Sequence, residues 1–85
     1  MLQWRGQRWG MTQRLVSNRV AGATYQITRE DYEDGFVYHA WRDVRGLVTE
    51  LGAGFGTSEE CDRETALKRA KDVCTADAAR RIGRE

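Results

Sequence analysis

Residues 23–51, ATYQITREDYEDGFVYHAWRDVRGLVTEL, decide the fold, because apolar and polar side chains alternate there around two turn signals. Within residues 23–29, Tyr25 and Ile27 share one face and polar residues the other, which is typical of a half-buried strand. The Asp-Gly pair at 34–35 is a strong hairpin signal. The stretch therefore predicts antiparallel strands joined by tight turns.

Two further strands follow the Asp-Gly pair. Residues 36–43 carry apolar side chains on both faces, which predicts the central strand of the sheet. Residues 43–46 (DVRG) supply the next turn, and alternation resumes over residues 47–55. Gly52 and Gly54 predict a bend or bulge late in this strand. Together these segments predict a three-stranded antiparallel sheet, with Leu47, Leu51 and Phe55 facing its core.

One long helix is predicted after the sheet. Residues 57–60 (TSEE) form a capping box with Thr57 as the cap, and Gly83 marks the end. Acidic residues near the start and basic residues near the end suit the helix dipole. Its apolar stripe consists of Ala66, Leu67, Ala70, Val73, Cys74, Ala78 and Ile82. The predicted fold class is α+β, a three-stranded antiparallel sheet packed against one long carboxyl-terminal helix.

The amino-terminal residues give a weaker pattern. Residues 1–11 contain a near-duplication, QWRG followed by QRWG, with no strand or helix period, and we predict a flexible Trp/Arg-rich arm. Residues 12–20 fit either a short extra strand or one or two helical turns, and we favour the strand. This division leaves residues 12–85 as a single α+β domain.

Length and composition narrow the class of protein. At 85 residues with 40% hydrophobic side chains, the chain has room for one modest core. No apolar run is long enough for a membrane span, and no secretory signal is evident, so we expect a cytoplasmic protein. Cys61 and Cys74 would lie about 20 Å apart on one helix, too far for a disulfide.

Charge is strongly segregated along the chain. Residues 1–29 hold five arginines and no acidic residue, whereas residues 30–64 hold ten acidic residues against three arginines. Residues 65–85 are basic again, although the net charge of the whole chain is only +1. Such segregation is typical of chains that bind a charged partner.

Nothing in the sequence assembles an active site, and we predict a protein that is not an enzyme. His39 is the only histidine and has no cysteine or serine at a recognisable spacing. The acidic residues at 30–34 lack the spacing of a calcium loop. The glycine-rich residues 52–56 precede a helix, but no phosphate-binding lysine follows them. We predict no catalytic residue, no metal and no cofactor.

A nucleic-acid partner is one of two binding hypotheses. Residues 36–70, especially GFGTSEE at 54–60, resemble the strand–turn–helix boundary of the AP2-type and integrase amino-terminal DNA-binding fold, and of the double-stranded-RNA-binding domain. The resemblance implies a three-stranded sheet that faces nucleic acid. The chain departs from the RNA-binding family in placing acidic residues where that family has lysines. Its basic amino-terminal arm would then contact phosphates.

A protein partner is the hypothesis that we favour. In size and charge segregation the chain resembles phage and plasmid accessory proteins, including anti-CRISPR inhibitors. An acidic middle with aromatic anchors suits docking on a basic protein surface, because aromatic and arginine side chains dominate interface energetics. Trp41 with Tyr38 or His39 on an uncovered sheet face is one candidate patch, and an edge strand is another. The predicted partner-binding residues are Trp4, Arg5, Arg8, Trp9, Tyr38, Trp41 and Arg42.

Overall fold

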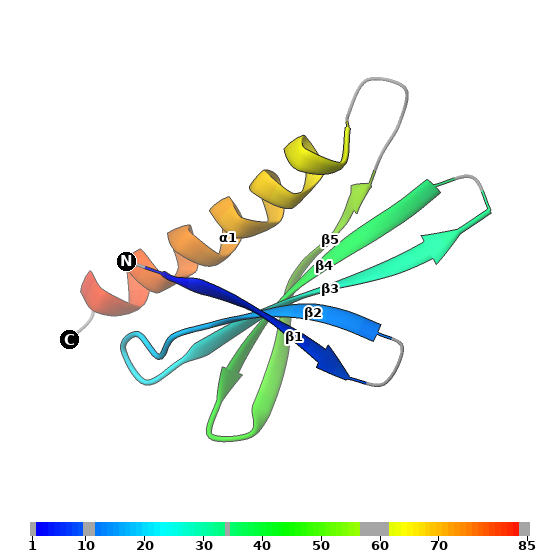
Figure 1. The fold of residues 1–85 in the computed structure, drawn as a ribbon. Coiled ribbons are helices and arrows are strands. Elements are labelled where there is room, and N and C mark those ends of the chain that lie inside the picture. Colours follow the sequence, from blue (N-terminus) through cyan, green and yellow to red (C-terminus); the bar gives the residue numbers. More distant parts are fainter. Residues whose placement is uncertain (1, 10–11, 34, 57–61, 84–85) are drawn as a thin grey trace.

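The chain folds as a five-stranded antiparallel sheet followed by one helix (Figure 1). The computed structural model describes residues 2–9, 12–33, 35–56 and 62–83. The elements are β1 (Trp4–Trp9), β2 (Thr12–Ser17), β3 (Thr24–Tyr32), β4 (Gly35–Val44), β5 (Leu47–Gly56) and α1 (Arg63–Gly83). Each strand pairs with the next along the chain, in the order β1-β2-β3-β4-β5. The α+β class is as expected, but the predicted three-stranded sheet is wrong.

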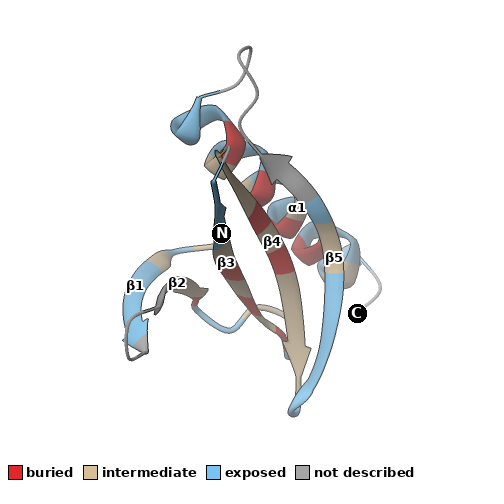
Figure 2. Cartoon of the chain, turned by 90° about the vertical axis from the view of Figure 1, so that its right-hand side faces the viewer, coloured by how far each residue is buried: buried red, intermediate tan, exposed pale blue. Residues whose placement is uncertain are grey.

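The two additional strands form a hairpin at the amino-terminal edge of the sheet. The stretch assigned above to an arm provides β1, which pairs with β2 from Trp4↔Ser17 to Trp9↔Thr12. Backbone hydrogen bonds can hold such a pair without the side-chain alternation that identifies a half-buried strand. β2 pairs with β3 over only three positions, Arg14 to Val16. The β1–β2 hairpin consequently twists away from the other strands (Figure 2).

The predicted hairpins of the central sheet are confirmed. β3 and β4 pair in register from Thr24↔Asp43 to Tyr32↔Gly35. In the next turn Arg45 and Gly46 both have positive φ, 54° and 86°, as a two-residue hairpin loop of this twist requires. The Asp43 carboxylate accepts a hydrogen bond from the Gly46 amide at 2.8 Å. The β4–β5 register shifts near Ala40 and Gly52, where the glycines predicted an irregularity.

The helix begins later than the sequence suggested. The predicted capping residues Thr57 and Glu60 lie outside the described residues, and α1 starts at Arg63. Asp62 acts as the cap, because its Oδ1 accepts a hydrogen bond from the Thr65 amide at 2.8 Å. That backbone hydrogen bond favours the ionised carboxylate and lowers the pKa of Asp62. The end of α1 at Gly83 is as predicted.

The core lies between α1 and one face of β3 and β4. Its buried residues are Ala23, Tyr25, Ile27, Tyr38, Ala40, Ala66, Ala70, Cys74 and Ala78. Alanines supply most of the helix side, so the helix backbone can approach the sheet closely. Leu47 was expected in this core but is 73% exposed, because the β4–β5 tip extends past α1 (Figure 2). Ile82 is likewise exposed at the end of α1.

Candidate functional site

Strand alternation divides the side chains of β3–β5 between two faces. Tyr25, Ile27 and Tyr38 face α1 and are buried, whereas their sequence neighbours face the other way. We call this opposite side the open face. It is formed by Gln26, Thr28 and Glu30 of β3, His39 and Trp41 of β4, and Glu50 of β5. The structure describes no segment that covers it.

Trp41 is the central aromatic residue of the open face. It is half-buried, and its indole Nε1 donates a hydrogen bond to Thr28 Oγ1 at 2.9 Å. Its ring stacks on the imidazole of His39, with centroids 5.9 Å apart and planes inclined by 21°. A side chain held on two sides loses little rotamer freedom when a ligand packs on it. The Trp41 side chain is therefore held in one orientation on the open face.

His39 lies between two carboxylates of the open face. Its Nδ1 is 3.0 Å from Glu50 Oε1 and its Nε2 is 2.9 Å from Glu30 Oε1, with the side chain only 16% exposed. The Nδ1 contact with Glu50 has hydrogen-bond geometry, whereas the Nε2 contact with Glu30 meets only the distance of an ion pair. Each ring nitrogen therefore has an acidic neighbour within 3.0 Å. The arrangement places a stacked imidazole and indole beside two carboxylates on the open face.

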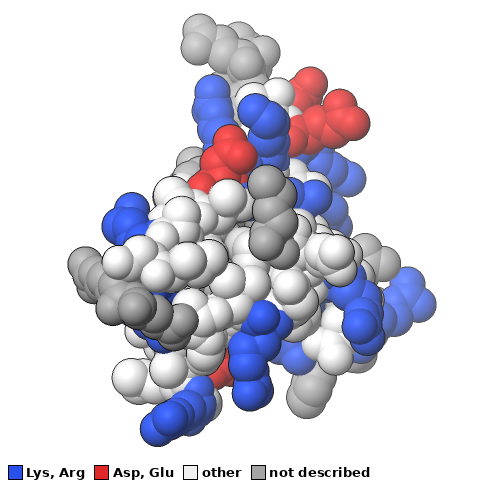
Figure 3. Space-filling view, turned by 90° about the vertical axis from the view of Figure 1, so that its left-hand side faces the viewer, with Lys and Arg blue, Asp and Glu red and all other residues white. Residues whose placement is uncertain are grey.

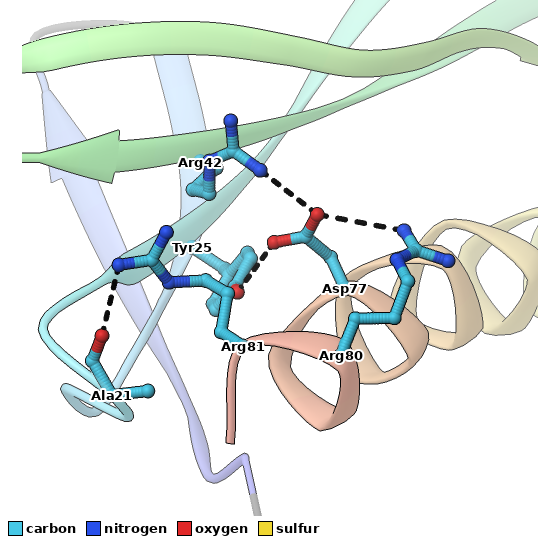
Figure 4. Close-up of polar contacts among 6 residues, drawn as sticks. All are labelled: Ala21, Tyr25, Arg42, Asp77, Arg80 and Arg81. Carbon is cyan, nitrogen blue, oxygen red and sulfur yellow. Dashed lines mark hydrogen bonds and ion pairs between the residues drawn. The ribbon is translucent and has the colours of Figure 1, made fainter. Parts of the chain in front are cut away.

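A second cluster of polar groups centres on Asp77 of α1, which is only 5% exposed (Figure 4). Its carboxylate accepts hydrogen bonds from the Tyr25 hydroxyl at 2.7 Å and from Arg42 Nη1 at 2.9 Å. Arg80 Nη2 lies 3.5 Å away. We call this the Asp77 clamp. Because it joins α1 to β3 and β4 with every oxygen satisfied, its primary effect is on stability.

The electrostatics of the clamp follow from burial and hydrogen bonding. Burial opposes ionisation of Asp77, but hydrogen bonds from Tyr25 and Arg42 outweigh it and hold the pKa of the carboxyl below its ordinary value. Burial and the neighbouring carboxylate raise the pKa of Tyr25. Burial, together with the charge of Asp77, also raises the pKa of Cys74 to about 12. Cys74 is therefore a neutral core thiol at physiological pH and not a nucleophile.

The predicted partner-binding residues lie in separate places. Trp41 is on the open face, but Tyr38 and Arg42 are on the helix side, in the core and the Asp77 clamp. On β1, Trp4 is half-buried against the edge of the core, while Arg5 and Arg8 are exposed. Trp9 also belongs to β1, although its side chain is outside the described part of the structure.

Sequence reasoning missed two features of these sites. Asp77 stands one helical turn after Cys74 on the apolar stripe of α1, and an acidic residue at such a position signals a buried partner. Glu30 and Glu50 flank His39 only because β3 and β5 pair on either side of β4. Only the register of β3, β4 and β5 identifies these two carboxylates as neighbours of His39.

The β1–β2 hairpin carries positive charge without compensating acids. Arg5, Arg8 and Arg14 lie on its two strands, and we call it the basic hairpin. Arg14 is held by Gln7 Oε1 at 2.9 Å and by Gln26 Oε1 at 3.2 Å. On the face of the molecule drawn in Figure 3, basic side chains outnumber acidic ones.

Comparison with protein-family models, curated proteins and solved structures found no match. Within the described residues, α1 is too polar to serve as a membrane-spanning helix. The open face and the basic hairpin are the two surfaces of the described chain that bear on its function.

Proposed function

We propose that the chain is a non-enzymatic protein-interaction module, of the accessory or inhibitor kind found in phages and plasmids, that docks through its open face. The observation that supports this is the position of Trp41, half-buried on the sheet face opposite α1 and fixed by Thr28 and His39. Tryptophan is among the residues most enriched at interface hot spots. Its immobilisation before binding reduces the entropy lost on association.

The chemistry around Trp41 favours a partner with a basic surface. Glu30 and Glu50 lie on either side of His39, and Asp43 shares their face of the sheet. Carboxylates around an aromatic anchor steer a cationic surface and reject an anionic one. We place this interaction in the cytoplasm, where a free buried thiol such as that of Cys74 stays reduced.

Replacing Trp41 with alanine should weaken partner binding by about 30-fold, the effect of losing a hot-spot residue. The measurement is co-purification of tagged protein from its host, followed by titration of the captured partner. Trp4→Ala, which removes a half-buried tryptophan from β1, is the matched control and should bind like the unchanged chain. Retention of the partner by Trp41→Ala at unchanged affinity would exclude the open face.

The acidic contribution is tested separately by the double variant Glu30→Gln and Glu50→Gln. It should slow association and make the rate less sensitive to salt, because rim charges act mainly on encounter. An association rate that the double variant leaves unchanged at low salt would contradict a basic partner, even if Trp41 proved essential.

Nucleic-acid binding is the second candidate function, and the basic hairpin favours it. A two-stranded ribbon fits the major groove of duplex DNA, and arginines on such a ribbon can contact phosphates. Arg5 and Arg8 are both exposed on β1. The described carboxylates all come after residue 29 in the sequence, outside this hairpin.

Binding to random duplex DNA or RNA should then fall steeply as salt rises, because each neutralised phosphate releases a counterion. The double variant Arg5→Ala and Arg8→Ala should reduce the slope of log K against log salt by about two. Arg45→Ala, in the β4–β5 turn, should leave the slope unchanged. Absence of binding at low salt would remove this candidate.

A further inference from the structure

A hollow of about 420 Å³ lies on the helix side of the sheet, across it from the open face. It opens between the basic hairpin, the middle of β3 and β4, and the first turns of α1. Its apolar lining comes from Leu15 of β2, Ile27 of β3 and Leu67 of α1. The hollow exists because α1 packs on β3, β4 and β5 and leaves β1 and β2 uncovered. Its volume falls in the range of small-molecule sites.

Two arginines stand beside this apolar lining. Arg8 pairs with Gln13 on β2, and Arg29 pairs with Tyr38 on β4, so strand alternation directs both to the side of the sheet that holds Leu15 and Ile27. Arg29 Nε contacts Asp31 at 3.0 Å, which leaves the other guanidinium donors for a ligand. Arg14 also lines the hollow, but its guanidinium is bound by Gln7 and Gln26. No acidic residue lines the hollow in the described chain.

Tyr38 contributes an aromatic ring and its hydroxyl to the same lining. It lines the hollow and is only 7% exposed. Its ring packs edge-on against Phe36, at a centroid distance of 5.4 Å. No hydrogen bond of its hydroxyl is found among the described residues, and this oxygen is not one of the buried polar atoms, so it stays accessible from the hollow. An accessible hydroxyl next to Arg29 can donate a further hydrogen bond to an anionic ligand.

We propose that this hollow binds an apolar organic anion, a hydrocarbon group that carries a carboxylate. The hydrocarbon packs on Leu15, Ile27 and Leu67, and the carboxylate accepts hydrogen bonds from Arg8 and Arg29. Guanidinium groups suit a carboxylate because their paired donors match its two oxygens. The apolar lining is aliphatic apart from Tyr38, whose ring packs edge-on against Phe36, so the hollow lacks the open aromatic platform on which a nucleobase would stack. This site is independent of the open face and of any macromolecule that binds there.

The test is calorimetric titration of the full chain with sodium octanoate, with 1-octanol and sodium acetate as the two partial ligands. Octanoate should bind, and each partial ligand should bind at least about tenfold more weakly, because a charge-assisted hydrogen bond and the apolar burial each contribute this much. A second arm uses the peptide acetyl-Gly-Gly-Leu-Leu against its carboxyl-terminal amide. If the peptide with a free carboxyl terminus binds and octanoate does not, the natural ligand is a peptide terminus. If octanoate binds and the peptide does not, the natural ligand is a small organic acid.

Three variants locate the site. Arg8→Gln and Arg29→Gln should each weaken octanoate binding about tenfold. Arg19→Gln is the control and should leave octanoate binding unchanged, because Arg19 belongs to the basic residues 1–29 but does not line the hollow. Amide spectra report both the fold of each variant and the residues that octanoate shifts, expected at Leu15, Ile27 and Leu67. Equal affinity for octanol, shifts centred on Trp41, or no binding in either arm would overturn the proposal.

Discussion

Replacing Asp77 with alanine should lower the free energy of unfolding by roughly 3–5 kcal/mol, the cost of removing one member of a buried ion pair. The loss is large because the remaining partners stay where they are. Arg42 would keep a guanidinium that is mostly buried, and Tyr25 would keep a buried hydroxyl without an acceptor. A domain of this size is stabilised by only about 5–10 kcal/mol in total, so the variant should be close to unfolding.

The measurement is urea denaturation at neutral pH, with Asp72→Ala as the matched control. Asp72 is an exposed acid on the same helix, and its ion pair with Lys68 spans 3.8 Å, so its loss should cost well under 1 kcal/mol. Tyr25→Phe removes the donor and keeps the ring, and should cost about 1–2 kcal/mol. Combined with Asp77→Ala it should be less than additive, since both break the same contact. Equal stability of Asp77→Ala and Asp72→Ala would show that the clamp carries no stability.

The central sheet was predictable because its side chains report burial directly. Tyr25 and Ile27 alternate with polar residues, and the Asp-Gly and Arg-Gly turns have the backbone conformations that a tight hairpin requires. The β1 strand was not predictable on this basis. The side chains of residues 5–8 are exposed on both faces of β1, so apolar and polar residues need not alternate there. The strand is held by backbone pairing with β2, which leaves no such pattern in the sequence.

The orientation of the sheet was the decisive ambiguity. β4 has apolar residues on both faces, so alternation alone pairs Tyr38 with Ala40 and His39 with Trp41 without saying which pair the helix covers. The helix takes the side of Ala40, whose small side chain admits a close approach of the alanine-rich stripe. The indole and imidazole instead use cross-strand partners, Thr28, Glu30 and Glu50, that are polar and close to solvent. The candidate docking face is therefore a consequence of helix packing.

The first loss of stability at alkaline pH should come from Cys74. Its pKa is raised to about 12 in the folded chain by burial, against about 8.5 for an exposed thiol. Below the unfolded value both states hold the proton, and the fold is fully stable. Above it the unfolded chain releases the proton and the folded chain keeps it, so stability falls with slope up to about 1.4 kcal/mol per pH unit. The loss should continue from about pH 8.5 until the folded thiol ionises near pH 12.

Cys74→Ala isolates this contribution, because alanine fits the small stripe of α1 and has no proton to lose. The variant should be somewhat less stable than the unchanged chain at pH 7, from the small cavity, yet the two curves should converge and cross as pH rises. Urea denaturation in reductant between pH 7 and pH 11 measures both. Tyr25 stays in both chains, and its raised pKa adds the same alkaline loss to each above about pH 10. If the two chains instead differ in stability by the same amount at every pH in this range, the Cys74 thiol must have the same pKa in the folded and unfolded states. Cys74 would then not be buried between α1 and the sheet.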